Sequence, residues 1–202
     1  MVLVIDTSSP CSALALVEAG RPIEEDVIAG GREHDLPGRV RAFVHPRRLG
    51  AVAVSLGPGS FTGLRVGVSY GVGLAMGLGV PLYGLGSLEV QAARATVPAS
   101  AVVEAGRGRL YWLHPSGERG HGEPADLSPL WPVVGWLRAG TAEALRAAGI
   151  NRLEKGDLHT FAEATAGLLT SAERLSYGSV KLKYMRSFGT VPEWQGKNGP
   201  DS

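Results

Sequence analysis

The sequence predicts an α/β fold in which one layer of strands and helices is built twice, with a reduced second copy. Short apolar runs with tight turns between them open the chain, and such runs indicate antiparallel strands. Apolar runs then alternate with helical patterns up to residue 97, as in a mixed layer. The apolar strand, acid and turn of Val4–Ser8 return at Val102–Gly106. A recurrence over about 100 residues indicates a duplicated lobe rather than a solenoid.

The first half of the chain contains strands and helices whose limits follow from apolar periodicity and turn residues. Ser60 and Ser87 are placed to cap two of the helices with their hydroxyls. The expected elements are the strands Val2–Ile5, Cys11–Val17, Ile23–Ile28, Ala51–Leu56 and Val80–Leu85, and the helices Asp35–His45, Phe61–Leu78 and Ser87–Thr96. Three antiparallel strands followed by this alternation are typical of a ribonuclease-H-like layer.

The second half repeats this order less completely. The expected elements are the apolar strand, acid and turn of Val102–Gly106, the strands Leu110–Leu113 and Val133–Trp136, the helices Thr141–Ala148 and Leu158–Leu169, and a polar loop over Gly117–Pro129. We therefore expect an N-terminal lobe over residues 1–97 and a smaller C-terminal lobe of related topology over residues 98–188. The turn-rich residues 189–202 are expected to form a flexible tail.

The composition describes a globular protein without a strong charge. Of 202 residues, 44% are hydrophobic and 19% are charged, and the formal net charge is +1. This charge provides no general attraction to nucleic acid or to a membrane surface. Cys11 is the only cysteine, so an internal disulfide is excluded and a reducing compartment is expected. Met1 leads directly into a strand pattern without the layout of a signal peptide, so we expect a cytoplasmic protein.

The predicted helix Phe61–Leu78 carries small residues four positions apart. They are Gly59, Gly63, Gly67, Gly71, Ala75 and Gly79. Each glycine inside a helix costs about 1 kcal/mol relative to alanine, so this pattern needs a compensating gain. Residues four apart form a ridge, and small ones open a groove that another backbone can approach closely. Two interpretations stay open: tight packing against the protein's own sheet, and docking of a partner helix.

Other interpretations of the same region are disfavoured. No charged residue occurs between Arg65 and Glu89, but several glycines and Pro81 interrupt the run, which argues against a membrane span. The residues from Gly67 to Gly71 match G-x-S-x-G, although Ser69 falls inside the helix rather than on the sharp turn that a hydrolase nucleophile needs. The turn before the helix lacks the lysine of a Walker loop.

The candidate chemistry of the chain is limited to one acid and one basic patch. The histidines, which are His34, His45, His114, His121 and His159, do not pair at helical spacing, so no metal site is predicted. Asp6 follows the first strand, where a carboxylate could hold a magnesium nucleotide or cap its own turn. Glu104 is the matching acid of the second half. The patch of Arg39, Arg41, Arg47, Arg48 and His45 fits RNA phosphates, an acidic partner or a solvated face.

Several blocks of the sequence together resemble the bacterial TsaB (YeaZ) family. The blocks are Val4–Ser8, Cys11–Leu16, Arg32–His34, Gly57–Gly67 (GPGSFTGLRVG), Val80–Gly84 and Ser87–Glu89. The resemblance covers residues 1 to about 95 and is thinner afterwards, where Glu104-Ala105-Gly106 replaces the usual Asp-Ala-Arg. Lys183–Arg186 and Pro192–Trp194 resemble the closing segment of the family, whereas residues 114–155 match nothing.

The resemblance implies an actin-like ATPase fold of two related lobes and a role in making threonylcarbamoyladenosine in tRNA. It implies a non-catalytic subunit that binds the transferase TsaD, with TsaE as a further ATPase partner. The paired-histidine motif by which TsaD holds its metal is missing from this chain. The resemblance implies no catalytic residues, no cofactor, no membrane association, and only indirect or weak contact with tRNA.

The resemblance also implies a homodimer that exchanges its own copy for TsaD through the first two helices. The expected interface residues are Leu36, Arg39, Val40, Phe43, Gly59, Ser60, Phe61, Gly63, Leu64, Gly67, Gly71 and Ala75. A vestigial nucleotide site is expected at Asp6, Thr7 and Ser8. The alternatives are an ATP-dependent small-molecule kinase or ATPase of the same fold that uses Asp6, and a glycoprotease-like hydrolase that uses Ser69.

Overall fold

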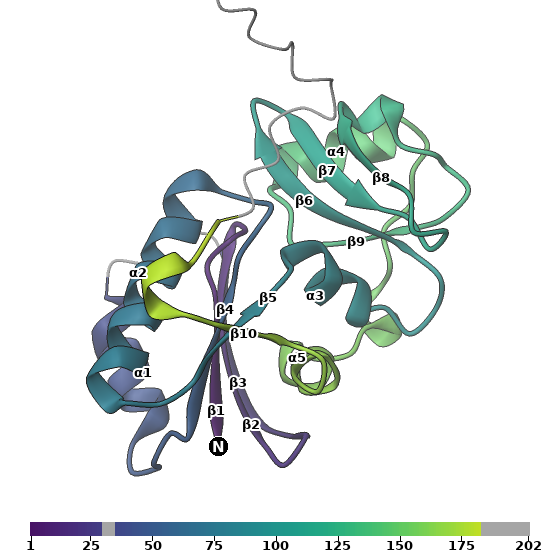
Figure 1. The fold of residues 1–202 in the computed structure, drawn as a ribbon. Helices are drawn as coiled ribbons and strands as arrows, with labels where there is room; N and C mark the ends of the chain where they lie inside the picture. Colours follow the sequence, from purple (N-terminus) through teal and green to yellow (C-terminus); the bar gives the residue numbers. More distant parts are fainter. Residues whose placement is uncertain (30–34, 183–202) are drawn as a thin grey trace, which may run out of the picture.

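The computed structural model describes residues 1–29 and 35–182 and has a mixed α/β fold. These residues form a six-stranded sheet and a four-stranded sheet, with helices beside and between them (Figure 1). The motif Arg32–His34, the closing segments Lys183–Arg186 and Pro192–Trp194, and the predicted tail 189–202 lie outside the described residues. Among the described helices, none combines the length and the hydrophobicity that crossing a bilayer requires.

The first sheet has the strand order β10-β5-β4-β1-β2-β3. Its strands are β1 (Val2–Asp6), β2 (Cys11–Glu18), β3 (Arg21–Ala29), β4 (Ala51–Ser55), β5 (Leu82–Leu85) and β10 (Glu173–Leu175). Strands β1, β2 and β3 form the predicted antiparallel meander, and β4 and β5 add to β1 in parallel. The strand β10 was not predicted; it pairs antiparallel with β5 at the edge of the sheet.

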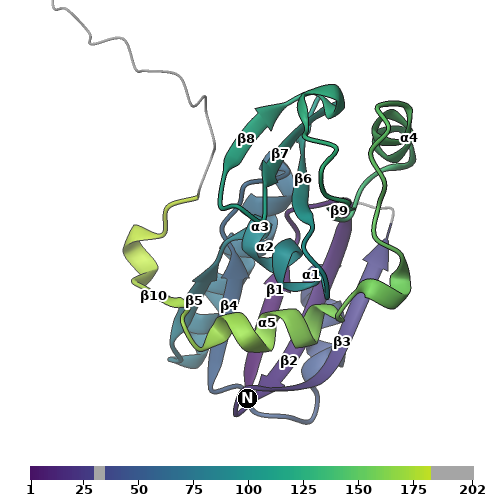
Figure 2. The same ribbon diagram turned by 90° about the vertical axis from the view of Figure 1, so that its right-hand side faces the viewer.

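Helices cover both faces of the first sheet. Helices α1 (Leu36–Val44) and α2 (Phe61–Leu78) lie on one face, and α3 (Ser87–Ala93) and α5 (Phe161–Leu169) on the other (Figures 1 and 2). The side chain of Ser60 caps α2 by accepting from Gly63 N at 3.2 Å, which confirms the predicted helix start. Ser87, in contrast, is not a cap, because α3 is capped at Gly86 and Ser87 is already its first helical residue.

The second sheet has the strand order β8-β7-β6-β9. Its strands are β6 (Ser100–Gly106), β7 (Arg109–Leu113), β8 (Arg119–Gly122) and β9 (Val133–Val134), with α4 (Ala139–Ala147) packed beside them. Strands β6, β7 and β8 are antiparallel and β9 joins β6 in parallel, which is the order of β3-β2-β1-β4 in the first sheet. The expected loop over Gly117–Pro129 therefore contains a strand and a 3-10 turn at Pro124–Asp126.

The last described elements return to the first sheet. The predicted boundaries place residues 161–175 in the C-terminal lobe, whereas α5 packs on β2 and β3, and β10 extends the first sheet. Helix α5 begins at Phe161 rather than Leu158, because Thr160 caps it. Phe161 is 1% exposed and lies in one core with residues of β1 and β2. The chain thus leaves the first sheet after α3, builds the second sheet, and comes back.

Candidate functional site

The small-residue ridge of α2 faces the protein's own sheet and is not an open groove. A β-carbon on Gly59 or Gly63 would collide with the backbone of the loop that follows β1, and one on Gly71 would collide with Val54 of β4. Gly67 stands equally close to the hydroxyl of Thr7, and Ala75 is 0% exposed. The glycines compensate for their cost by letting α2 lie directly on the strands. Of the two interpretations that the sequence leaves open, packing against the protein's own sheet accounts for these residues.

The predicted interface residues of α1 are also directed inward. Leu36 and Val40 are 2% and 3% exposed and belong to the core under the sheet, with Phe43 packed against it. The guanidinium of Arg39 donates to Asp26 Oδ2 at 2.6 Å and to Ser12 Oγ at 2.8 Å. The apolar face of a helix that covers a sheet normally packs on that sheet, and Arg39 ties the same face to β2 and β3. Leu64 of α2 is likewise 1% exposed.

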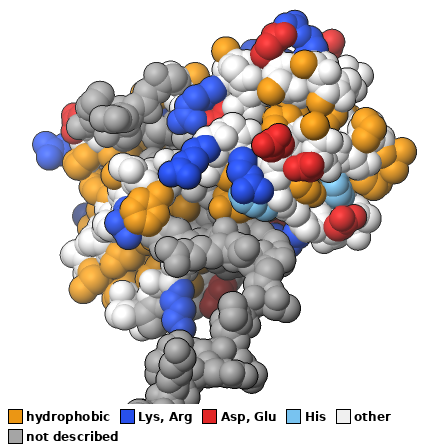
Figure 3. Space-filling model, turned by 90° about the horizontal axis from the view of Figure 1, so that it is seen from above, with side chains coloured by type: hydrophobic (Ala, Val, Ile, Leu, Met, Phe, Trp, Pro, Cys, Tyr) orange, Lys and Arg blue, Asp and Glu red, His pale blue; other side chains and the backbone are white. Residues whose placement is uncertain are grey.

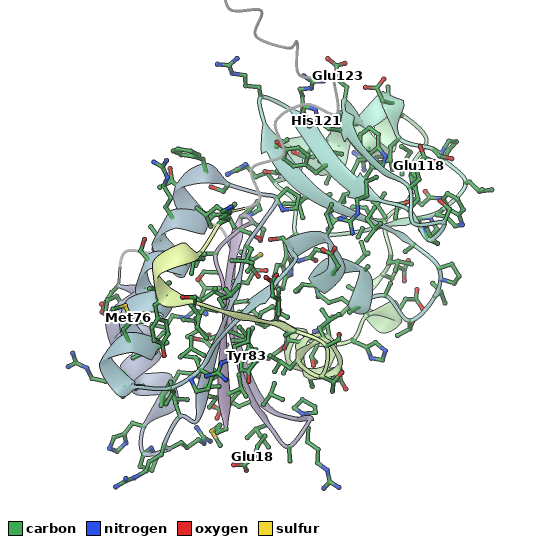
Figure 4. The ribbon with its side chains drawn as sticks, viewed as in Figure 1. Glu18, Met76, Tyr83, Glu118, His121 and Glu123 are labelled. Carbon is green, nitrogen blue, oxygen red and sulfur yellow. The ribbon has the colours of Figure 1, made fainter. Side chains whose placement is uncertain are left out.

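The opposite face of α2 is exposed and mostly apolar or small. Phe61, Val66 and Met76 are 53%, 39% and 57% exposed, and Figure 4 shows Met76 on the outer side of the helix. The guanidinium of Arg65 lies over the Phe61 ring at 3.6 Å, and Arg65 is the one charged residue of α2. Small residues complete this face, which we call the outer face of α2. They are Thr62, Ser69, Gly73 and Gly77. The sequence contains this second ridge, because Ser69, Gly73 and Gly77 also stand four apart.

Asp6 lies at the end of β1 in a fully enclosed position. It is 0% exposed, and its Oδ1 accepts from Ser8 N at 2.7 Å, as expected for an acid that caps its own turn. Its Oδ2 has no hydrogen-bond partner among the described residues. The hydroxyls of Ser8 and Ser55 lie beside the carboxylate without meeting full hydrogen-bond geometry. Burial raises the pKa of Asp6, and these hydroxyls and the charge of Arg94 only partly oppose that change.

Arg94, at the end of α3, is the cation whose charge acts on Asp6. Its guanidinium donates to Gln91 Oε1 at 2.8 Å and stacks over the Trp136 ring at 4.3 Å. Burial lowers the pKa of Arg94, against the charges of Glu25, Cys11 and Asp6, which raise it. Because Arg94 is 8% exposed and Asp6 is not exposed at all, the predicted nucleotide residues lie in the interior rather than on an open cleft.

Glu104, the acid of the second sheet that corresponds to Asp6, bonds to the start of α4. Its carboxylate accepts from Arg138 N and from Thr141 Oγ1, both at 2.7 Å, and also pairs with the Arg138 guanidinium. These groups belong to the first turn of α4, where a negative charge is favourable. Glu104 therefore caps α4 and has no open side for a ligand.

The remaining candidates from the sequence are the basic patch, Ser69 and a metal-binding cluster. In the basic patch, Arg39 pairs with Asp26 and Arg47 pairs with Glu24 at 2.8 Å. Ser69 lies in the middle of α2 and not on a strand-to-helix turn. Within residues 1–29 and 35–182, three or more His, Cys, Asp or Glu side chains do not meet in a group that could hold a metal ion.

Comparisons with known proteins agree with the motif blocks. Residues 41–123 match the family model described as TsaD, tRNA N6-adenosine threonylcarbamoyltransferase. The chain is 32% identical over 122 residues to the tRNA threonylcarbamoyladenosine biosynthesis protein TsaB of Bacillus subtilis, which covers 54% of this chain and 52% of that protein. It is 35% identical over 86 residues to the TsaB of Escherichia coli, covering 39% of this chain and 37% of that protein. The chain thus spans about half the length, or less, of such curated relatives.

The fold agrees over a longer range than the sequence. The chain superposes on YeaZ from Pseudomonas aeruginosa with a TM-score of 0.66 at 21% identity, covering 91% of this chain and 99% of that one. At this identity the likeness concerns the fold alone. The resemblance of the chain to the TsaB (YeaZ) proteins is thereby confirmed, in sequence over part of its length and in fold over nearly all of it.

Proposed function

We propose that the protein is a non-catalytic subunit of the machinery that makes threonylcarbamoyladenosine in tRNA, and that it binds a TsaD-like transferase. The names of the curated relatives support the pathway, and the YeaZ-like fold supports the class of protein. The pathway also implies a cytoplasmic location and a TsaE-like ATPase as a further partner. The shared strand order of the two sheets supports a duplicated ribonuclease-H-like fold, divided near residue 97.

The outer face of α2 carries this proposal. It exposes Phe61, Val66 and Met76 on a long helix whose opposite face is anchored on the sheet. Scattered exposed apolar residues are ordinary, but an apolar row with a single charge on one helix face is typical of a contact surface. Ser69, Gly73 and Gly77 leave room for a second helix to approach closely. We assign this face to a helix of the transferase, and to a second copy of this chain when the transferase is absent.

The enclosure of Asp6 supports the non-catalytic part of the proposal. A magnesium nucleotide needs a carboxylate that it can reach, and this one is 0% exposed, with one oxygen bonded to the backbone of Ser8. A kinase or ATPase mechanism at Asp6 is therefore less favoured than a subunit that supports the chemistry of its partner.

Light scattering tests the proposal on this chain alone and mixed with the TsaD-like transferase of the same organism. We expect a dimer that converts into a mixed complex, and we expect Val66→Arg and Met76→Glu to abolish both assemblies while circular dichroism remains unchanged. Val97→Arg is the matched control, because Val97 is a 45% exposed apolar residue outside α2. Normal assembly of both α2 variants, or an equal loss of assembly in the control variant, would refute the assignment of the outer face of α2 as the contact surface.

A further inference from the structure

A second surface lies on the face of the β7–β8 hairpin that looks toward α3. Tyr111 of β7 and His121 of β8 stand directly opposite each other in the ladder. Their rings are 4.7 Å apart between centroids and inclined by 30°, and both side chains are half-buried. The two rings thus form one half-buried aromatic pair, in which Tyr111 also packs against the core that includes Leu88 of α3.

Arginines adjoin this ring pair on the same face. Arg109 lies two residues before Tyr111, so both side chains leave β7 on one side of the sheet. Burial lowers the pKa of His121, and the positive charge of Arg109 lowers it further. Arg119, two residues before His121, pairs with Glu89 of α3 at 2.6 Å.

The turn between β6 and β7 adds another cation at the end of the sheet. Arg107 is exposed and has a left-handed backbone with φ 53°, between Gly106 and Gly108, which have φ 80° and 75°. Figure 3 shows Lys and Arg side chains across the middle of the upper face of the molecule, beside a histidine. The acidic residues Glu118 and Glu123 stand at the two ends of β8, with His121 between them (Figure 4).

The other face of these strands is fixed by the core of the second sheet. Leu110 and Trp112 are buried there against Leu145 of α4. Gly120 lies directly on the Trp112 ring, so a larger residue at that position would displace the strand. The ring pair is therefore presented by a rigid support, which lowers the entropic cost of binding.

We propose that Tyr111, His121 and Arg109 form a contact surface for single-stranded RNA, in which a base stacks on the ring pair and the arginine bonds the adjoining phosphate. Half-buried aromatic rings beside exposed arginines are groups that unpaired bases and their backbone can use. An acidic protein segment would use Arg107 and Arg109 but would gain little from a neutral ring pair. This surface is separate from the outer face of α2 and does not depend on the proposed assembly with a transferase.

Fluorescence anisotropy of this chain alone tests the surface, with a labelled single-stranded RNA of ten alternating uridine and adenosine residues as the probe. We expect His121→Ala and Arg109→Gln each to weaken binding at least about fivefold. His121→Phe, which keeps a ring, should bind like the wild type. Arg109→Gln should also reduce the slope of log Kd against log salt by about 0.7, because one phosphate contact is lost.

Arg146→Gln is the matched control, since Arg146 is an exposed arginine on α4. No binding of the RNA by the wild type, or equal weakening in the control, would overturn the proposal. So would tight binding of a polyglutamate peptide that Arg109→Gln abolishes while RNA binding persists. If RNA binding is absent but the mixed complex forms normally, only the RNA surface is contradicted. If the mixed complex does not form but RNA binds, only the proposed function is contradicted.

Discussion

The backbone carbonyl oxygen of Thr7 occupies the space that a β-carbon on Gly63 would need. The hydroxyl of Thr7 also donates to the carbonyl oxygen of Gly63 at 2.7 Å, so the loop after β1 is bonded directly to the first turn of α2. This contact explains the small-residue ridge: it brings a helix onto the end of a strand. The surface left for a partner is the opposite face of the same helix.

A substitution at Gly63 should therefore destabilise the monomer. Gly63→Ala forces the Thr7 backbone away, and overpacking of this kind typically costs about 1–3 kcal/mol of unfolding free energy. Gly73→Ala is the matched control, because nothing lies within 4 Å of the added β-carbon. The control should stabilise the helix by up to about 1 kcal/mol. Urea denaturation measures both, and equal effects would show that the ridge does not contact the sheet.

Arg39 is expected to hold α1 in place rather than to bind a partner. Arg39→Met removes hydrogen bonds to Asp26 and Ser12, and bonds to charged groups contribute about 1.5–3 kcal/mol each to stability. Since Asp26 is 36% exposed, water compensates part of this loss, and we expect a decrease near the lower value. Arg41→Met, at an exposed position of the same helix, should change stability by less than about 0.5 kcal/mol. Comparable losses in the two variants would contradict this assignment.

The buried carboxyl of Asp6 should make stability depend on pH. Burial raises its pKa in the folded protein above the usual value of an aspartate, so the folded state binds the proton more tightly than the unfolded state. Stability from this group is therefore present at low pH and is lost as the pH rises from about 4 through the folded pKa. Asp6→Asn removes this loss. The free energy of unfolding of the variant, relative to that of the wild type, should therefore increase between pH 4 and pH 7. A difference between the two proteins that does not vary with pH would contradict the burial of this charge.

The sequence predicts the elements of the first sheet up to β5 well, because local signals set each of them. The limits of α2 follow from the turn at Gly57–Gly59, the capping hydroxyl of Ser60 and the glycine at its end, and the structure has them at Phe61 and Leu78. The strand β10 could not be predicted, because it is three residues long and two of these are charged. Only its pairing with β5 makes it a strand.

The direction of each helix face could not be read from spacing alone. Residues four apart on α2 form two ridges, one through Gly63 and Gly67 and one through Ser69 and Gly73, and the pattern does not distinguish them. The position of Thr7 beneath the helix decides between them. In the same way, Asp6 is fully buried and experiences the charge of Arg94, far along the chain, which no local signal near Asp6 reveals.

The central claim is tested most directly by the synthesis of threonylcarbamoyladenosine in tRNA by the TsaD-like transferase of the same organism, with this chain present or absent. We expect the modified nucleoside to form only when this chain is present. Asp6→Asn should support its formation, and Val66→Arg should not. Equal synthesis by the transferase without this chain, or full activity with Val66→Arg, would contradict the account.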